Sequence, residues 1–128
     1  MKTLSLRVLP DQFAICRLPP DAPVPEPVAG GGFWSLTRTG KEVSVVLPSA
    51  GVPAGCKCET GWRCLEVQGP LAFDLTGVLA ALAAPLAEAG ISIFCISTYD
   101  TDYVLVRLGD LPAAERALRE SGHTILGM

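Results

Sequence analysis

The stretch Ile91 to Val106, ISIFCISTYDTDYVLV, decides the fold of this chain. Segments rich in β-branched and aromatic residues flank a polar centre from Ser97 to Asp102, and this pattern predicts two strands joined by a bend. Gly90 ends an Ala- and Leu-rich helical segment just before the stretch, and a second helical segment begins at Asp110 just after it. The predicted order is therefore helix, strand, strand, helix.

One further strand is expected outside each helix. Trp62 to Val67 has a strand pattern ahead of the first helix, and Thr124 to Leu126 follows the second. The complete order is the ferredoxin-like βαββαβ arrangement, an α+β fold in which two helices cover one face of an antiparallel sheet. This fold hosts many functions, so it does not decide the activity.

The two helices have distinct signals. The first is expected from about Leu71 to Ala89, with a bend at Pro85, because proline has no N–H to donate to the Ala81 carbonyl. The second is expected from Leu111 to about Ser121, with Gly122 ending it. The residues expected to face the sheet are Leu75, Val78, Leu79, Leu82 and Leu86 in the first helix and Leu111, Ala114 and Leu118 in the second.

The N-terminal half has a less regular pattern. Leu4 to Leu9 and Phe13 to Leu18 predict a hairpin with its turn at Pro10. Phe33 to Leu47 predicts another hairpin that is similar to the later one, and this similarity indicates a duplicated unit. The Pro- and Gly-rich stretch Pro19 to Gly32 between them is expected to be an ordered loop or a linker.

Composition excludes several classes of partner. The chain of 128 residues is 49% hydrophobic, with a mean hydropathy of +0.39, as expected of a soluble domain with a well-buried hydrophobic core. Its formal net charge of -3 provides no basic surface for nucleic acid or anionic lipid, so neither partner is expected. The longest apolar run, Leu75 to Ala89, is shorter than the ~20 residues of a membrane span, so no membrane helix is expected. No secretory signal precedes Leu4, and a cytoplasmic location is therefore expected.

Five cysteines are present, at Cys16, Cys56, Cys58, Cys64 and Cys95. An odd number in a chain large enough to have a core argues against an oxidised framework. Cys56, Cys58 and Cys64 suggest a metal site, but closed zinc sites have four ligands, commonly paired at two-residue spacing, and His123 is distant in sequence. We expect no metal site, and we expect Cys16 and Cys95 to be small core residues.

Three segments carry a family resemblance: FDLTGVL at residues 73–79, LAEAGISI at 86–93 and STYDTDYVLV at 97–106. They resemble the ACT domain, and more narrowly the small bacterial proteins of tandem ACT-like units and the ACT units of CASTOR-type cytosolic arginine sensors. The Ser-Thr-x-x-Thr-Asp hairpin is the most specific of these marks. The resemblance implies an N-terminal ACT-like half at residues 1–60 and a C-terminal ACT domain at residues 61–128.

ACT domains generally bind amino acids or similar small effectors and regulate another activity. The resemblance therefore implies a non-catalytic regulatory module that binds a free amino acid. The module is expected to need no cofactor and to form a homodimer. The absence of a paired Ser/His or Cys/His arrangement and of a Walker loop also argues against an enzyme. The alternative is a structural or interaction protein in which paired ACT-like units have no functional ligand pocket.

A ligand site is expected where the first helix begins and the hairpin bends. Backbone N–H groups around Gly77 can bind a carboxylate at the positive end of the helix, and Asp74 or Asp102 can bind an ammonium group. The expected site residues are Asp74, Leu75, Thr76, Gly77, Val78, Ser97, Thr98, Thr101 and Asp102.

A simpler interpretation of the same residues remains open. Asp74 or Thr76 can serve only as the N-cap of the helix, while Asp100 and Asp102 can be ordinary turn residues. Gly77 is harder to explain in this way, because glycine in a first helical turn costs about 1 kcal/mol relative to alanine. We therefore expect a ligand or a crossing strand to require its missing side chain.

Overall fold

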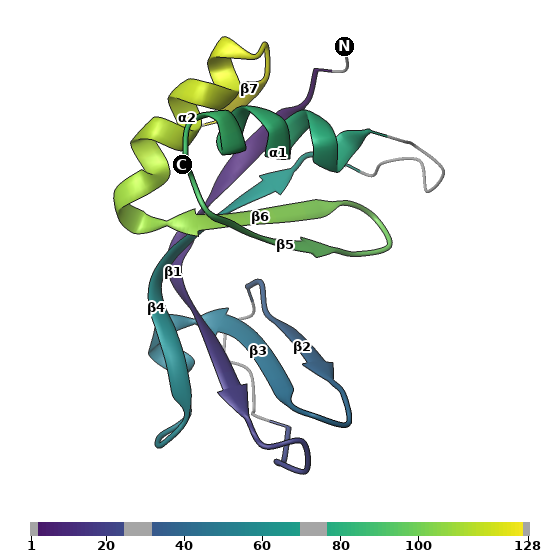
Figure 1. Ribbon diagram of the computed structural model, residues 1–128, viewed down its shortest axis with the longest axis vertical. Coiled ribbons are helices and arrows are strands. Elements are labelled where there is room, and N and C mark those ends of the chain that lie inside the picture. The colour runs from purple at the N-terminus through teal and green to yellow at the C-terminus, as the bar shows by residue number, and fades with distance from the viewer. Residues whose placement is uncertain (1–2, 25–31, 70–76, 127–128) are drawn as a thin grey trace. The chain divides into compact units, whose positions relative to one another are not determined.

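A computed structural model describes residues 3–24, 32–69 and 77–126 of the chain (Figure 1). The chain divides into two compact units: unit 1 contains Met1–Pro10 and Arg63–Met128, and unit 2 contains Asp11–Trp62. The boundary after Trp62 lies close to the predicted one after residue 60, but residues 1–10 group with the C-terminal unit instead of the N-terminal half. The N-terminal residues belong with the C-terminal unit because Leu4, Leu6 and Val8 are part of its hydrophobic core.

Unit 1 has the predicted βαββαβ order, and the α+β ferredoxin-like fold is confirmed. Its elements are β4 (Lys57–Val67), α1 (Val78–Glu88), β5 (Ile93–Ser97), β6 (Asp102–Arg107), α2 (Leu111–Glu120) and β7 (Thr124–Leu126). The first part of β1 (Ser5–Leu18) joins the same sheet, whose strand order is β7-β1-β4-β6-β5. β5 and β6 are antiparallel, as the predicted hairpin requires, and Ser97 lies opposite Asp102.

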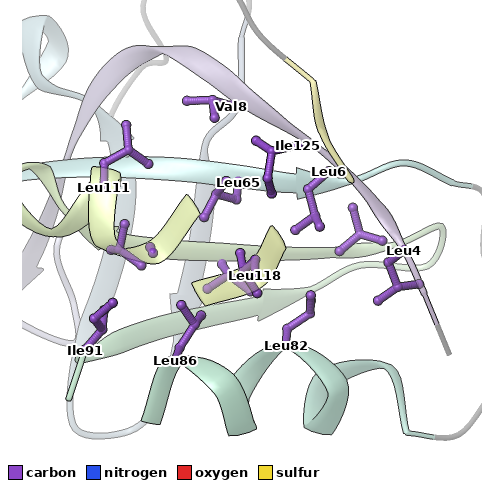
Figure 2. Close-up of a cluster of buried hydrophobic side chains, with 14 of the residues drawn as sticks. Leu4, Leu6, Val8, Leu65, Leu82, Leu86, Ile91, Leu111, Leu118 and Ile125 are labelled. Carbon is purple, nitrogen blue, oxygen red and sulfur yellow. The ribbon is translucent and has the colours of Figure 1, made fainter. Parts of the chain in front are cut away.

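The core of unit 1 lies between the sheet and the two helices (Figure 2). α2 buries the three residues predicted to face inward, Leu111, Ala114 and Leu118. α1 buries Val78, Leu82 and Leu86, but Leu79 is 37% exposed, so its predicted inward position is wrong. Residues four apart share a helix face, whereas Leu79 lies about 100° around the axis from Val78. In the part of the chain that is described, neither helix has the length and hydropathy of a membrane-spanning helix.

Unit 2 is built from strands. Its elements are β2 (Ser35–Arg38), β3 (Val43–Pro48), a short 3-10 turn (Ser49–Gly51), the second part of β1 and the start of β4. β2 and β3 form the predicted second hairpin, and β3 also pairs with β1. Residues 11–24 and 32–62 contain no α-helix, so this described part does not repeat the βαββαβ order expected of an ACT-like half.

The predicted first hairpin is wrong, because β1 is one continuous strand of 14 residues. Its pairing with β7 ends at Arg7, and its pairing with β3 begins at Phe13. Pro10 lies between these two segments, so its missing N–H removes no hydrogen bond to either strand.

Pro85 lies inside α1 as predicted, and a distant side chain replaces the hydrogen bond that it removes. Nε2 of His123 lies 3.0 Å from the Ala81 carbonyl oxygen, and the Leu4 N–H donates to Nδ1 of the same ring at 3.1 Å. Because Nδ1 accepts a hydrogen bond and so carries no hydrogen itself, Nε2 carries the ring hydrogen and donates it to the Ala81 carbonyl oxygen. His123 is only 4% exposed, so the neutral ring satisfies two backbone groups in the interior.

We predict that His123→Ala lowers the free energy of unfolding by about 1–3 kcal/mol for each backbone group left without a partner. In a Pro85→Ala background the restored N–H can bond to the Ala81 carbonyl, so the same His123 substitution should cost about 1 kcal/mol less. Urea denaturation of the four proteins in this double-mutant cycle measures the difference. Equal costs in both backgrounds would contradict the replacement of the helical bond by His123.

Candidate functional site

The bend between β5 and β6 is a hydrogen-bonded turn that runs from Thr98 to Thr101. The Thr98 N–H donates to the Thr101 carbonyl at 2.8 Å, and the Thr98 hydroxyl donates to the same oxygen at 3.0 Å. The Thr101 N–H in turn lies 3.3 Å from the Thr98 hydroxyl oxygen. Ordinary turn chemistry therefore accounts for Thr98, and its hydroxyl is already used within the bend.

Thr101 attaches this bend to the end of β4. Its hydroxyl donates to the Val67 carbonyl at 2.8 Å, and the residue is only 8% exposed. A buried hydroxyl needs such a partner, since an unpaired one would be costly. The bond therefore holds the hairpin bend beside the last residue of β4.

A pocket of about 280 Å³ lies between the end of β4 and the hairpin bend. Its lining residues are Glu66, Val67, Gln68, Gly69, Asp100, Thr101 and Tyr103. The Tyr103 hydroxyl donates to Oε2 of Glu66 at 3.1 Å, and Nε2 of Gln68 donates to Oε1 at 3.3 Å. Both oxygens of the Glu66 carboxylate are therefore oriented by neighbours before any ligand binds.

The surroundings of Tyr103 favour its neutral form. Desolvation, the hydrogen bond to Glu66 and the nearby negative charges, including those of Glu66 and Asp100, raise the pKa of Tyr103 to about 12. At neutral pH the phenol is thus a hydrogen-bond donor in the pocket wall, and Glu66 is its acceptor.

Among the predicted site residues that the structure describes, only Thr101 lines this pocket. Side chains alternate along β6, so Asp102 lies on the opposite face of the strand from Thr101 and Tyr103. Asp102 instead shares a face with Ser97, its partner in register, and with Cys95. Desolvation and the charge of Asp102 raise the pKa of the Cys95 thiol, as expected for neighbours on one face.

Gly77 is the N-cap of α1, not a residue of its first turn. Its φ of 80° lies in the left-handed region, and a Cβ atom there would meet no described atom within 4 Å. The glycine is therefore explained by its backbone conformation, and no described strand approaches it, whereas the expected approach of a ligand stays a prediction. Val78 begins the helix with its side chain in the core, while Asp74, Leu75 and Thr76 lie outside the described residues.

The beginning of α1 and the hairpin bend lie at the same end of unit 1 (Figure 1). Gly77 brings no side-chain oxygen to cap the helix, and the first turn of α1 contains no acidic residue. The free N–H groups and the positive end of the helix dipole are therefore not offset by a side chain of that turn.

Sequence reasoning missed Glu66, Gln68 and Tyr103 as pocket residues and treated Asp100 only as a turn residue. A signal was present at the end of β4. Glu66 and Gln68, the residue just after the strand, are polar and two residues apart, while Leu65 and Val67 are buried on the other face. That Tyr103 pairs with Glu66 could not be seen in the sequence, because it depends on the register between β4 and β6.

Comparison with protein families agrees with this architecture. The ACT domain family model matches residues 57–120, which are half of the chain. The chain belongs to the ACT domain family. A second family model, described as an N-terminal domain, matches residues 11–55, which lie within unit 2.

A curated relative of this ACT-domain chain is named as a sensor. The cytosolic arginine sensor for mTORC1 subunit 1 of Bos taurus is 48% identical over 90 residues, which are 62% of this chain and 27% of the sensor. The chain thus spans about a quarter of the length of that curated relative.

Two solved structures show the same fold. Protein Atu0741 of Agrobacterium tumefaciens has a TM-score of 0.92 at 38% identity, covering 100% of this chain and 96% of the other. The regulatory subunit of aspartate kinase from Thermus thermophilus has a TM-score of 0.65 at 12% identity, covering 94% of this chain and 99% of that one. At that low identity the second likeness shows the fold alone.

We predict that Tyr103 titrates with a pKa of about 12 instead of its ordinary 10.0. In a Tyr99→Phe variant Tyr103 is the remaining tyrosine, so tyrosinate absorbance reports it directly. Because the folded pKa is raised, Tyr103 contributes stability fully below pH 10 and loses this contribution as the pH rises through about 12. Adding Glu66→Gln should lower the midpoint, although desolvation keeps it above the ordinary value. An unchanged midpoint would contradict the contact with Glu66.

Proposed function

We propose that this ACT-domain chain is a non-catalytic regulatory module that binds a free amino acid. The observation that carries the proposal is the polar pocket between the end of β4 and the hairpin bend. Its volume of about 280 Å³ is near the lower end of the range for ligand pockets, which suits a ligand the size of an amino acid.

The pocket lining favours the ammonium group of such a ligand. Glu66 and Asp100 contribute two carboxylates, and the lining residues include no Lys, Arg or His. A carboxylate oxygen can accept more than one hydrogen bond, so Glu66 can bind an ammonium group while it stays bonded to Tyr103. Charge-assisted bonds of this kind are about twice as strong as neutral ones.

The N–H groups at the beginning of α1, at Gly77 and Val78, favour an anion because they lie at the positive end of the helix dipole. They lie on the helix-covered side of the sheet, opposite to Glu66 and Tyr103, so we assign them to a separate candidate site on the face that carries Ser97 and Asp102. The absence of an acidic residue from the first turn of α1 supports this assignment. Ser97 and Asp102 lie on the other face of the hairpin, at the same end of unit 1, and we keep them as candidate ligand-binding residues.

The relatives support a sensing role, and we transfer that role here only as a proposal. The bovine relative is named an arginine sensor, and the Thermus structure is named a regulatory subunit. Because the bovine sensor is named cytosolic, a cytoplasmic location is part of the same proposal. No particular amino acid is assigned, because the pocket residues that carry the argument recognise the ammonium group that all amino acids share.

A second candidate is an interaction module in which copies of the chain pair as a homodimer. Two observations favour it: β5 is the last strand on its side of the described sheet, and Glu88 is the one charged residue of α1. The outward residues of α1 that could pack against a partner are Leu79, Ala80, Ala84 and Ala87. An open strand edge beside an apolar helix face is a surface that a second copy can cover.

We expect one amino acid in a panel of the common ones to stabilise the chain. A ligand at a hundredfold excess over its Kd adds about 2.7 kcal/mol, which thermal-shift measurement detects as a rise of several degrees in Tm. Glu66→Gln and Asp100→Asn should each weaken that ligand about tenfold or more, because each removes a charged acceptor. Calorimetric titration measures the change in Kd.

Two variants serve as controls for this experiment. Glu120→Gln makes the matched change on the exposed surface of α2 and should leave the affinity unchanged. Asp102→Asn changes the opposite face of β6. If this variant loses affinity for the ligand and Glu66→Gln does not, the ligand binds on the face of Asp102 and not in the pocket. A flat response to the whole panel would contradict the proposed function and favour the interaction module.

For the homodimer, we expect Leu79→Arg to yield a monomer in sedimentation velocity at concentrations where the unmodified chain is a dimer. The physical reason is that an arginine on the outward face of α1 would be buried without a partner in the dimer. Glu120→Arg adds the same side chain on α2 and should leave the dimer intact. A monomeric unmodified chain would contradict pairing through α1 and β5.

A further inference from the structure

Three cysteine sulfurs converge in unit 2. The Sγ atoms of Cys16, Cys56 and Cys58 all lie within 4.8 Å of one another. A disulfide joins Cys16 to Cys58, and the Cys56 sulfur lies 3.1 Å from the Cys58 sulfur. The disulfide corrects the expectation of unbonded cysteines, and the third ligand of the cluster is Cys16, where the sequence suggested Cys64.

Strand geometry explains the cluster. Cys58 lies at the start of β4 and Cys56 just before it, and their sulfurs lie 3.1 Å apart. β1 neighbours β4 in the sheet and brings Cys16, which is 1% exposed, to the same place. The sulfurs pack against a small apolar cluster whose buried residues are Ala14, Cys16, Val45 and Leu47.

A disulfide alone does not account for this arrangement, because it uses two of the three sulfurs. Cys56 donates its thiol hydrogen to the Pro53 carbonyl at 3.1 Å and remains in contact with Cys58. Three sulfur atoms that lie within 4.8 Å of one another, from β1, β4 and the residue before β4, are the ligand set of a soft metal ion, whose preferred partners are thiolates. A zinc site with Zn–S bonds of about 2.3 Å places its sulfurs about 3.8 Å apart, which this cluster can accommodate after reduction.

We propose that the reduced chain binds one thiophilic metal ion, Zn²⁺ or Cu⁺, through the sulfurs of Cys16, Cys56 and Cys58. A phosphine or dithiol reductant first supplies two electrons that break the Cys16–Cys58 bond, and each of the two sulfurs takes up a proton. Binding then forms three metal–sulfur bonds and releases the protons of the coordinated thiols. Zn²⁺ keeps a fourth position for water, whereas Cu⁺ is satisfied by three sulfurs. The disulfide form is the oxidised, metal-free state of the same site.

The two remaining cysteines provide internal controls. Cys64 is buried in unit 1, where desolvation and the charge of Glu66 raise the pKa of its thiol to about 12. Cys95 is exposed on β5, so its predicted place in the core is wrong. Neither belongs to the cluster, so neither should contribute to metal binding.

The test uses the full chain, reduced with a phosphine under anaerobic conditions. Zn²⁺ and Cu⁺ are titrated in separate arms against chromophoric chelators that report stoichiometry and affinity. We expect one equivalent of at least one of these ions per chain, and at least a tenfold loss of affinity in Cys16→Ser, Cys56→Ser and Cys58→Ser. Cys64→Ser and Cys95→Ser should bind as the unmodified chain does, and the unreduced chain should bind neither ion.

Cys56→Ser is the decisive variant, because it leaves the Cys16–Cys58 disulfide intact and removes only the third sulfur. Unchanged affinity in this variant, loss of binding in Cys95→Ser, or no uptake of either ion by the reduced chain would each overturn the proposal. Far-UV circular dichroism reports folding in every sample. If reduction unfolds the chain, refolding on addition of the ion supports the site, and failure to refold counts against it.

Discussion

The continuity of β1 is the constraint on which both units depend. Its 14 residues pair in parallel with β7 near one end and antiparallel with β3 near the other, and it also neighbours β4. Buried N–H and C=O groups need partners, so a break in this strand would leave groups unpaired on several neighbours. The first ten residues therefore belong to the ACT-domain unit, although about fifty residues of unit 2 separate them from the rest of it in sequence.

The candidate pocket follows from the same geometry of strands. β4 places Leu65 and Val67 in the core, and its alternation turns Glu66 toward Tyr103 on the other face. The Thr101 hydroxyl then fixes the hairpin bend to the end of β4. The polar lining is thus a consequence of which face of each strand the hydrophobic core occupies, and the Glu66 carboxylate in it is oriented by hydrogen bonds within the protein.

Two features of the interior depend on residues far apart in sequence. Pro85 is tolerated inside α1 because His123 supplies the hydrogen bond that the helix lacks. The cysteine cluster likewise needs the pairing of β1 with β4, since Cys16 and Cys58 are 42 residues apart. In both cases a contact between residues far apart in sequence supplies the partner: His123 for the Ala81 carbonyl, and Cys16 for Cys58.

The sequence by itself determined the α+β class, the hairpin from Ile91 to Val106, the inward face of α2 and the family. The first three follow from periodicity and from caps such as Gly90 and Gly122, which act over a few residues. The family was indicated by resemblance in short motifs such as STYDTDYVLV at residues 97–106. Only the tertiary structure decided that β1 is unbroken at Pro10, that Asp102 faces away from the pocket and that Cys16 meets Cys58. Such outcomes depend on strand register and on contacts across long separations, and a shift of one residue in register reverses the face of every side chain in a strand.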